Sequence, residues 1–133
     1  MIKKDFFDDL ELYLCERFGY RNSIHVTPTM NGCCVSVLER DVKLYFRLWE
    51  YSKNVGGFPD WCIILVDCTF AKKQEQNLFD LARFFKEFGT LYGFKHLGTE
   101  QDKGNLHQQL GLQRTNYSSI AQNYVASLES LSV

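Results

Sequence analysis

The chain has 133 residues, of which 45% are hydrophobic, so it fits one domain (1–133) that can bury a core without disulfides. The net charge is -1, from 15 basic and 16 acidic residues, and gives no nucleic-acid signal. It excludes a protein that binds nucleic acid or an anionic membrane through a large positive charge alone. No apolar run approaches the roughly 20 residues that span a bilayer, and the charged segment after Met1 does not fit a secretory signal.

The first half of the chain predicts a helix followed by antiparallel strands. Apolar residues recur every three or four positions over residues 5–18, and Gly19 is a stop signal. Residues 23–50 are typical of strands, with a turn at Asn31-Gly32. Over residues 42–49 apolar side chains alternate with polar and aromatic ones, which indicates a half-buried strand that forms a hairpin with residues 34–38.

The middle of the chain predicts a βαβ unit. A Gly-Gly and Pro-containing loop at 51–60 precedes Trp61-Cys62-Ile63-Ile64-Leu65-Val66, a continuous apolar run whose two faces are both expected to be covered. The apolar stripe over 76–92 predicts a long helix ending at Gly93, and residues 94–100 are a candidate strand. The two strands should be parallel, with a right-handed crossover.

The end of the chain is less regular. Residues 105–110 predict a short helix that ends at Gly111. The segment 118–131 fits either a helical stripe or an edge strand, and both alternatives stay open.

The five cysteines indicate free thiols rather than a disulfide framework, and hence a cytoplasmic protein. Cys62 and Cys68 share a face of one strand by parity, but they would lie roughly 20 Å apart. No histidine or cysteine has the spacing of metal ligands, so no metal site is expected.

The order of elements and three local motifs resemble the GNAT superfamily of acyl-CoA N-acyltransferases. The motifs are the buried strand 61–70 leading into a long helix, the passage Tyr92-Gly93-Phe94-Lys95-His96-Leu97-Gly98-Thr99-Glu100, and the ending Asn105-Leu106-His107-Gln108-Gln109-Leu110-Gly111-Leu112. The specific part of the resemblance covers residues 61–114. It implies a mixed α/β (α+β) sheet with an N-terminal antiparallel hairpin, a central βαβ unit and helices on both faces.

The resemblance also implies an acetyl-CoA site at the start of the second helix. Backbone N–H groups in a glycine-containing loop would hold the pyrophosphate there. The matching positions here imply a cofactor contact set of Cys68, Phe70, Lys73, Gln76, Asn77, Leu78 and Asn105. No glycine occupies this loop in either alignment frame, and Leu78 or Phe79 would crowd the phosphates.

Two residues are candidate catalytic groups, one by the same resemblance and one by its position at a strand end. His107 occupies the position of the family's general acid, where an imidazole can protonate a departing thiolate. Asp67, at the end of the central strand, is a candidate general base, and Glu100 ends the adjacent strand. The alternative is that these side chains are solvated surface residues, which we favour for His107 and Glu100.

A basic-aromatic strand face is a candidate surface for a protein partner. Tyr45, Arg47 and Trp49 share one face of their strand, and Phe58 lies in the loop that follows. The alternative is a sheet face covered by other elements. We therefore predict a GNAT-like domain that has lost acyl-CoA chemistry and binds a macromolecular partner. The alternative is an acetyl-CoA-dependent N-acetyltransferase acting on an amine. The oligomeric state is left open.

Overall fold

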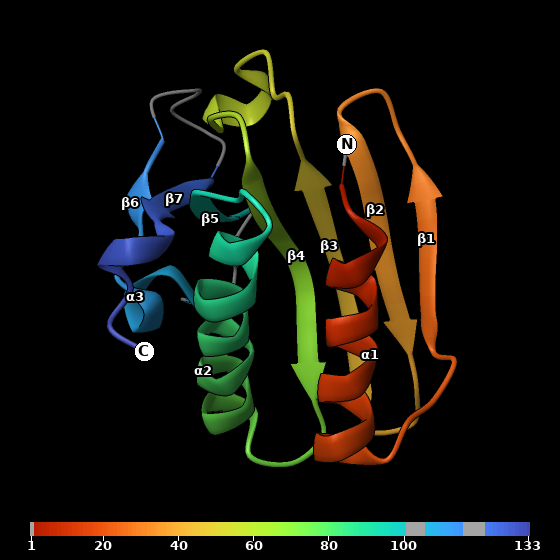
Figure 1. Cartoon of the computed structure of the whole chain (residues 1–133). Coiled ribbons are helices and arrows are strands. Elements are labelled where there is room, and N and C mark those ends of the chain that lie inside the picture. The colour runs from red at the N-terminus through yellow and green to blue at the C-terminus, as the bar shows by residue number, and fades with distance from the viewer. Residues whose placement is uncertain (1, 101–105, 116–121) are drawn as a thin grey trace.

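A computed structural model describes residues 2–100, 106–115 and 122–133 of the chain. Two long helices and a mixed β-sheet dominate it (Figure 1). The elements, in chain order, are α1 (Lys4–Phe18), β1 (Ile24–Pro28), β2 (Gly32–Leu38), β3 (Val42–Trp49), η1 (Val55–Gly57), β4 (Cys62–Phe70), α2 (Gln74–Phe84), η2 (Phe85–Gly89), β5 (His96–Thr99), α3 (Leu106–Leu110), β6 (Gln113–Arg114), β7 (Tyr124–Ser127) and η3 (Leu128–Ser130).

The described strands form one sheet in the order β1-β2-β3-β4-β5-β7-β6. Strands β1 to β4 are an antiparallel meander, and β5 then pairs parallel to β4 after the crossover through α2. The mixed α/β class, the β2–β3 hairpin and the βαβ unit predicted from the sequence are therefore confirmed. The ambiguous tail contains a strand, β7, but β7 lies between β5 and β6 rather than at the edge.

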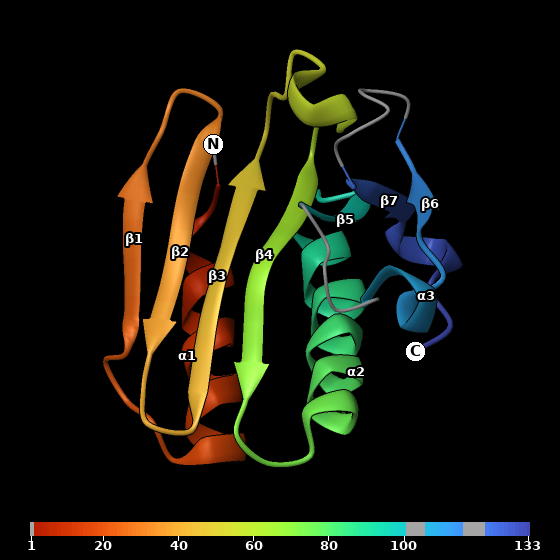
Figure 2. The same ribbon diagram turned by 180° about the vertical axis from the view of Figure 1, so that it is seen from behind.

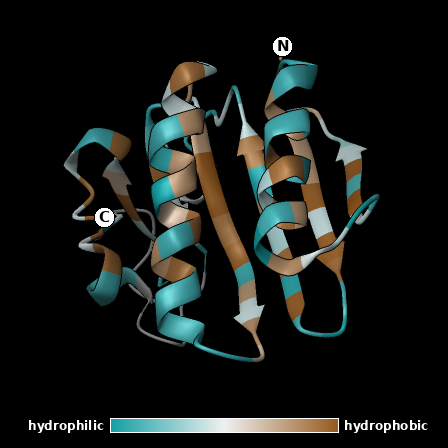
Figure 3. Ribbon diagram, turned by 60° about the horizontal axis from the view of Figure 1, so that its bottom comes forward, coloured by the Kyte–Doolittle hydropathy of each residue, from teal (hydrophilic) through white to brown (hydrophobic). Residues whose placement is uncertain are grey.

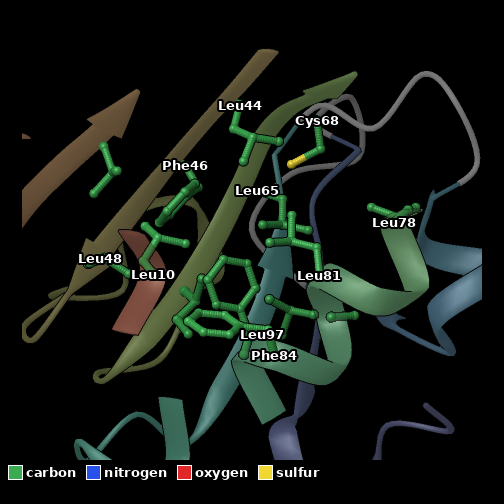
Figure 4. Close-up of a cluster of buried hydrophobic side chains, with 14 of the residues drawn as sticks. Leu10, Leu44, Phe46, Leu48, Leu65, Cys68, Leu78, Leu81, Phe84 and Leu97 are labelled. Carbon is green, nitrogen blue, oxygen red and sulfur yellow. The ribbon is translucent and has the colours of Figure 1, made fainter. Parts of the chain in front are cut away.

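The main core lies between the sheet and the two long helices. α1 contributes Phe6, Leu10 and Leu14 at helical spacing, and it ends at Gly19, whose φ of 78° and N–H bond to the Cys15 carbonyl close the last turn. Figure 4 shows leucines and phenylalanines of β3 and β4 meeting those of α2. In Figure 3 the hydrophobic colour follows the strand behind the helices, whereas the outward turns of both helices are largely hydrophilic.

Both long helices cover the same face of the sheet, as the front and back views show (Figures 1 and 2). The sequence predicts helices on both faces, and for α1 and α2 that prediction is wrong. The reason lies in β3, whose aliphatic residues and Phe46 point to the helices while Lys43 and Tyr45 point away and stay exposed. We call this second side the open face of the sheet.

The loop between β3 and β4 covers one end of the open face. Phe58 is 1% exposed and packs edge-on against Trp49, with ring centroids 6.2 Å apart, above Cys62 and Ile64. The ring fits because β5 has a glycine beneath it: a Cβ on Gly98 would lie 2.6 Å from Phe58 Cε1. This second cluster confirms that both faces of the apolar run are covered, and it shows that a loop covers the second one.

The second helix is not uniformly α-helical. α2 runs from Gln74 to Phe84 and continues as a π-helical turn, η2, over Phe85–Gly89. The adjacent Phe84 and Phe85, on either side of this junction, are both buried.

Candidate functional site

The centre of the candidate site is the point where β4 and β5 separate. The two strands pair in parallel from Cys62 and His96 to Leu65 and Thr99, and the Glu100 N–H then donates to the Leu65 carbonyl at 3.0 Å. Beyond this point β4 continues to Phe70 beside β3. The last part of β4 therefore has an edge, on the side of β5, at which the backbone of an extended ligand can pair.

A β-bulge sits at this point. Leu65 pairs with Phe46 and Asp67 with Tyr45, so Val66 is the extra residue of β4. The bulge reverses which residues face the helices. Cys68 faces the core with Leu65, whereas Cys62 lies under Phe58, so the expectation that the two cysteines share a face is wrong.

The side chain of Gln74 occupies this edge of β4. Its Oε1 accepts a hydrogen bond from the Phe70 N–H at 2.5 Å, and its Nε2 donates to the Cys68 carbonyl at 2.8 Å. One amide thus makes the pair of bonds that a neighbouring strand would make. The sequence analysis did not single out Gln74, because nothing in a one-dimensional pattern indicates that a helix-starting amide turns back onto the preceding strand.

The loop that leads into α2 shows where the expected cofactor residues lie. Lys73 has a left-handed backbone with φ 52° and ψ 50°, and both Lys73 and Gln76 are exposed. The Asn77 side chain donates to the Lys72 carbonyl at 2.8 Å. The Leu78 side chain is fully buried against the core, so it does not crowd the loop in the way expected from the sequence. The Cys68 and Phe70 side chains are buried as well, and Asn105 lies outside the described residues.

These residues do not fit the pyrophosphate of an acyl-CoA. The backbone at the helix start carries side chains where glycines would give close access, and Glu75 places a negative charge in the first turn. The backbone groups at Cys68 and Phe70, which an extended ligand would use, are already bonded to Gln74.

The two candidate catalytic residues take part in local contacts. The His107 ring on α3 stacks on Tyr124 of β7, with centroids 3.6 Å apart and planes within 4°. Asp67 is exposed on the open face and accepts a hydrogen bond from the Thr69 hydroxyl at 2.8 Å. Neither contact requires a substrate.

The residues predicted to bind a partner divide into two groups. Trp49 is 9% exposed and Phe58 is 1% exposed, so both belong to the core cluster of the open face and not to its surface. Tyr45 is 37% exposed, and Arg47 is half-buried beside it, with its guanidinium carbon 5.5 Å from the ring centroid. Only Tyr45 and Arg47 remain available at the surface.

Arg47 is the centre of a polar cluster on the open face. Its Nε donates to the Glu100 carboxylate at 3.0 Å, and its Nη1 lies 3.7 Å from the Cys34 sulfur. Burial lowers the pKa of Arg47, but the hydrogen bond and the charge of Glu100 outweigh it, so the net shift is upward. The hydrogen bond with Cys34 raises the pKa of Tyr45. The hairpin register, which pairs Cys34 with Arg47, is the signal that would have revealed the role of Cys34.

Three other cysteines, Cys33, Cys62 and Cys68, are buried, whereas Cys15 is partly exposed. Burial raises the pKa of the Cys33 thiol to about 12, and it raises the pKa values of Cys62 and Cys68 further. The described residues contain no group of three or more side chains suited to hold a metal ion.

Comparisons with known proteins add no relative to this picture, because no family model, curated protein or solved structure matches the chain. In the described part of the chain no helix combines the length and apolar character needed to cross a membrane.

Proposed function

We propose that this chain is a GNAT-like domain that no longer transfers acyl groups from CoA and instead binds a macromolecular partner through the open face of its sheet. The order of the elements supports the family resemblance: an antiparallel meander leads into β4, and α2 then returns the chain to a parallel β5.

The observation that carries the proposal is the position of the Gln74 side chain. Its amide bonds to the Phe70 N–H and the Cys68 carbonyl, where the backbone of β4 would otherwise pair with an extended ligand. Breaking both bonds to admit acetyl-CoA costs about 0.5–1.5 kcal/mol for each bond. The absence of glycine at the helix start adds a second obstacle to the phosphates.

The open face supports the partner-binding part. It is not covered by a long helix, and its exposed portion carries Lys43 and Tyr45 together with the half-buried Arg47. Tyrosine and arginine are residues that dominate the energy of many protein interfaces. Arg47 is held in place by Glu100, so it presents a fixed surface at little cost in side-chain entropy.

An acetyl-CoA-dependent N-acetyltransferase is the second candidate function. It is favoured by the separation of β4 from β5 and by Thr99, whose buried Oγ1 has no hydrogen-bond partner in the described residues. In that case an acetyl-CoA molecule would have to displace Gln74, and Lys73 and Asn77 would be the residues nearest its phosphates.

Binding of acetyl-CoA separates the two functions. A ligand present at 100 times its Kd raises the free energy of unfolding by about 2.7 kcal/mol. We expect no change in melting temperature for the wild-type chain at millimolar acetyl-CoA, and a clear increase would refute the loss of acyl-CoA chemistry. Gln74→Ala, with Gln76→Ala as the control, tests whether the amide is the obstacle.

Photo-crosslinking tests the partner surface. A benzophenone amino acid at position 45 lies on the open face, and the same group at position 91 replaces an exposed leucine away from this face. Partner adducts that form from position 45 and not from position 91 support the proposal. Adducts of equal yield from both positions would remove the open face from consideration.

A further inference from the structure

The outer edge of the sheet is formed by β1, whose one neighbour among the described strands is β2 (Figures 1 and 2). Its side chains are poorly covered, and only Ile24 is half-buried. Val26 is 43% exposed, although Val35, its neighbour on β2 in the same layer, is fully buried. The helices therefore stop covering the sheet one strand before its edge.

The backbone groups that point outward from β1 follow from the hairpin turn. Thr29 and Gly32 exchange both backbone hydrogen bonds, at 2.9 and 3.3 Å, so they form a hydrogen-bonded pair. Pairs alternate along an antiparallel ladder, so Pro28, Val26 and Ile24 are in non-hydrogen-bonded positions towards β2. Their free N–H and C=O groups point away from the sheet, and Pro28 alone has no N–H to offer.

This edge has little of the protection that sheet edges normally carry. The strand Ile24–Pro28 contains no lysine, arginine, aspartate or glutamate, and its register with β2 runs without a bulge. Pro28 at its end is the one protective feature, and it removes a donor only from the last position. The rest of the edge can pair with another strand.

We propose that a second copy of this chain pairs with β1 in antiparallel orientation, so that the two sheets join into one. The pairing places Val26 opposite Val26, Ile24 opposite Pro28 and His25 opposite Thr27 of the second copy. The two Val26 residues exchange both of their outward hydrogen bonds, and each Ile24 N–H donates to the Pro28 carbonyl opposite. In this register all five residues of β1 pair, and the backbone N–H and C=O groups that point outward from one copy meet those that point outward from the other. No other register meets both conditions.

The side chains favour the same pairing. Ile24, Val26 and Pro28 all lie on the helix side of the strand, so the pairing sets apolar side chains opposite apolar ones, and polar His25 and Thr27 meet on the open face. No charge opposes another charge across the axis. The contact is small compared with a standard interface of about 1,600 Å², so the dimer forms in the micromolar range of concentration or above.

Sedimentation velocity from about 10 to about 500 µM tests the proposal, since small interfaces associate weakly. The wild-type chain should shift from monomer to dimer over this range. Val26→Lys sets two like charges opposite each other and should weaken association at least about tenfold. Leu38→Lys adds the same charge at a 70% exposed leucine at the end of β2 and should leave association unchanged. A monomeric wild type, or a dimer that Val26→Lys does not weaken, overturns the proposal.

Amide hydrogen exchange of the wild-type chain gives a second test that needs no variant. The Thr27 N–H bonds to β2 and should be protected at every concentration, whereas the Val26 N–H should become protected only as the dimer forms. If a dimer forms while the Val26 exchange rate stays constant, another surface holds the copies together and the inference is wrong.

Discussion

Replacing Phe58 by alanine tests whether the loop over the open face is part of the core. The side chain is 1% exposed, and its ring packs against Trp49 above Cys62 and Ile64. Truncating a phenylalanine in such a position costs about 3–5 kcal/mol, which is a large share of the 5–15 kcal/mol that holds a domain of this kind together. Tyr45→Ala, at a 37% exposed ring on the same face, is the control and should cost less than about 1 kcal/mol.

Urea denaturation followed by circular dichroism measures both variants. With a slope of about 2 kcal/mol/M, the midpoint of Phe58→Ala should fall by about 2 M and that of Tyr45→Ala by less than about 0.5 M. If the two variants lose the same stability, Phe58 is not a core residue and the loop does not hold the open face.

Gly98 provides a sharper version of this test. A Cβ at position 98 would lie 2.6 Å from Phe58 Cε1 and 3.0 Å from the Tyr124 carbonyl oxygen. Gly98→Ala alone should therefore cost about 1–3 kcal/mol through overpacking. In the Phe58→Ala background the ring is gone and only the carbonyl contact remains, so the cost should drop by about 1 kcal/mol or more. Costs that add within about 0.5 kcal/mol would show that ring and glycine are not in contact.

Three further predictions concern the backbone, the tyrosines and the thiols. Gly32→Ala should lower the free energy of unfolding, measured in urea, by more than about 2 kcal/mol. The φ of Gly32 is 153°, and a Cβ there would lie 2.0 Å from a carbonyl oxygen of β3. A Cβ at Gly19 meets no atom within 4 Å, so Gly19→Ala should cost only about 1 kcal/mol of backbone strain. Burial raises the pKa of Tyr13 to about 12, and a hydrogen bond with an aspartate raises that of Tyr92 to about 12. Both tyrosines keep their protons to higher pH in the folded state than in the unfolded one, so their contribution to stability falls as pH rises from about 10 to about 12. Phenolate absorbance should show late-titrating tyrosines, and Tyr13→Phe and Tyr92→Phe should each remove one of them. A thiol reagent at neutral pH should modify at most two of the five cysteines before unfolding, because the other three are buried: Cys33, Cys62 and Cys68.

Elements with a regular pattern could be predicted from the sequence. The helical stripe ending at Gly19 gave α1, and the alternation over 42–49 gave β3 with the correct residues towards the core. The continuous apolar run at 61–66 indicated a strand covered on both faces. The helix after it indicated that the next strand would run parallel to it. Each of these predictions depends on a periodicity that burial imposes directly on the residue types.

Features that depend on one residue or on a distant partner could not be predicted in this way. The extra Val66 of β4 has no sequence signature, yet it moves Cys68 to the opposite face from Cys62. Trp49 and Phe58 resemble exposed binding residues in a linear pattern, because they are buried against each other and because the Phe58 ring fits only over Gly98, forty residues further along the chain. Gln74 has the composition of an ordinary helix start, and only the fold brings its amide to the edge of β4.

The π-helical turn at Phe85–Gly89 has a consequence for how this chain tolerates changes in length. A π turn is an α-helix that has gained a residue, so the helix can lose one residue here and return to regular α geometry. Such a deletion would leave the turns on either side close to their present orientation, whereas a deletion in the regular part of α2 would rotate the end of the helix by about 100° relative to its start. The second helix should therefore tolerate the loss of one residue within Phe85–Gly89 better than within Gln74–Phe84.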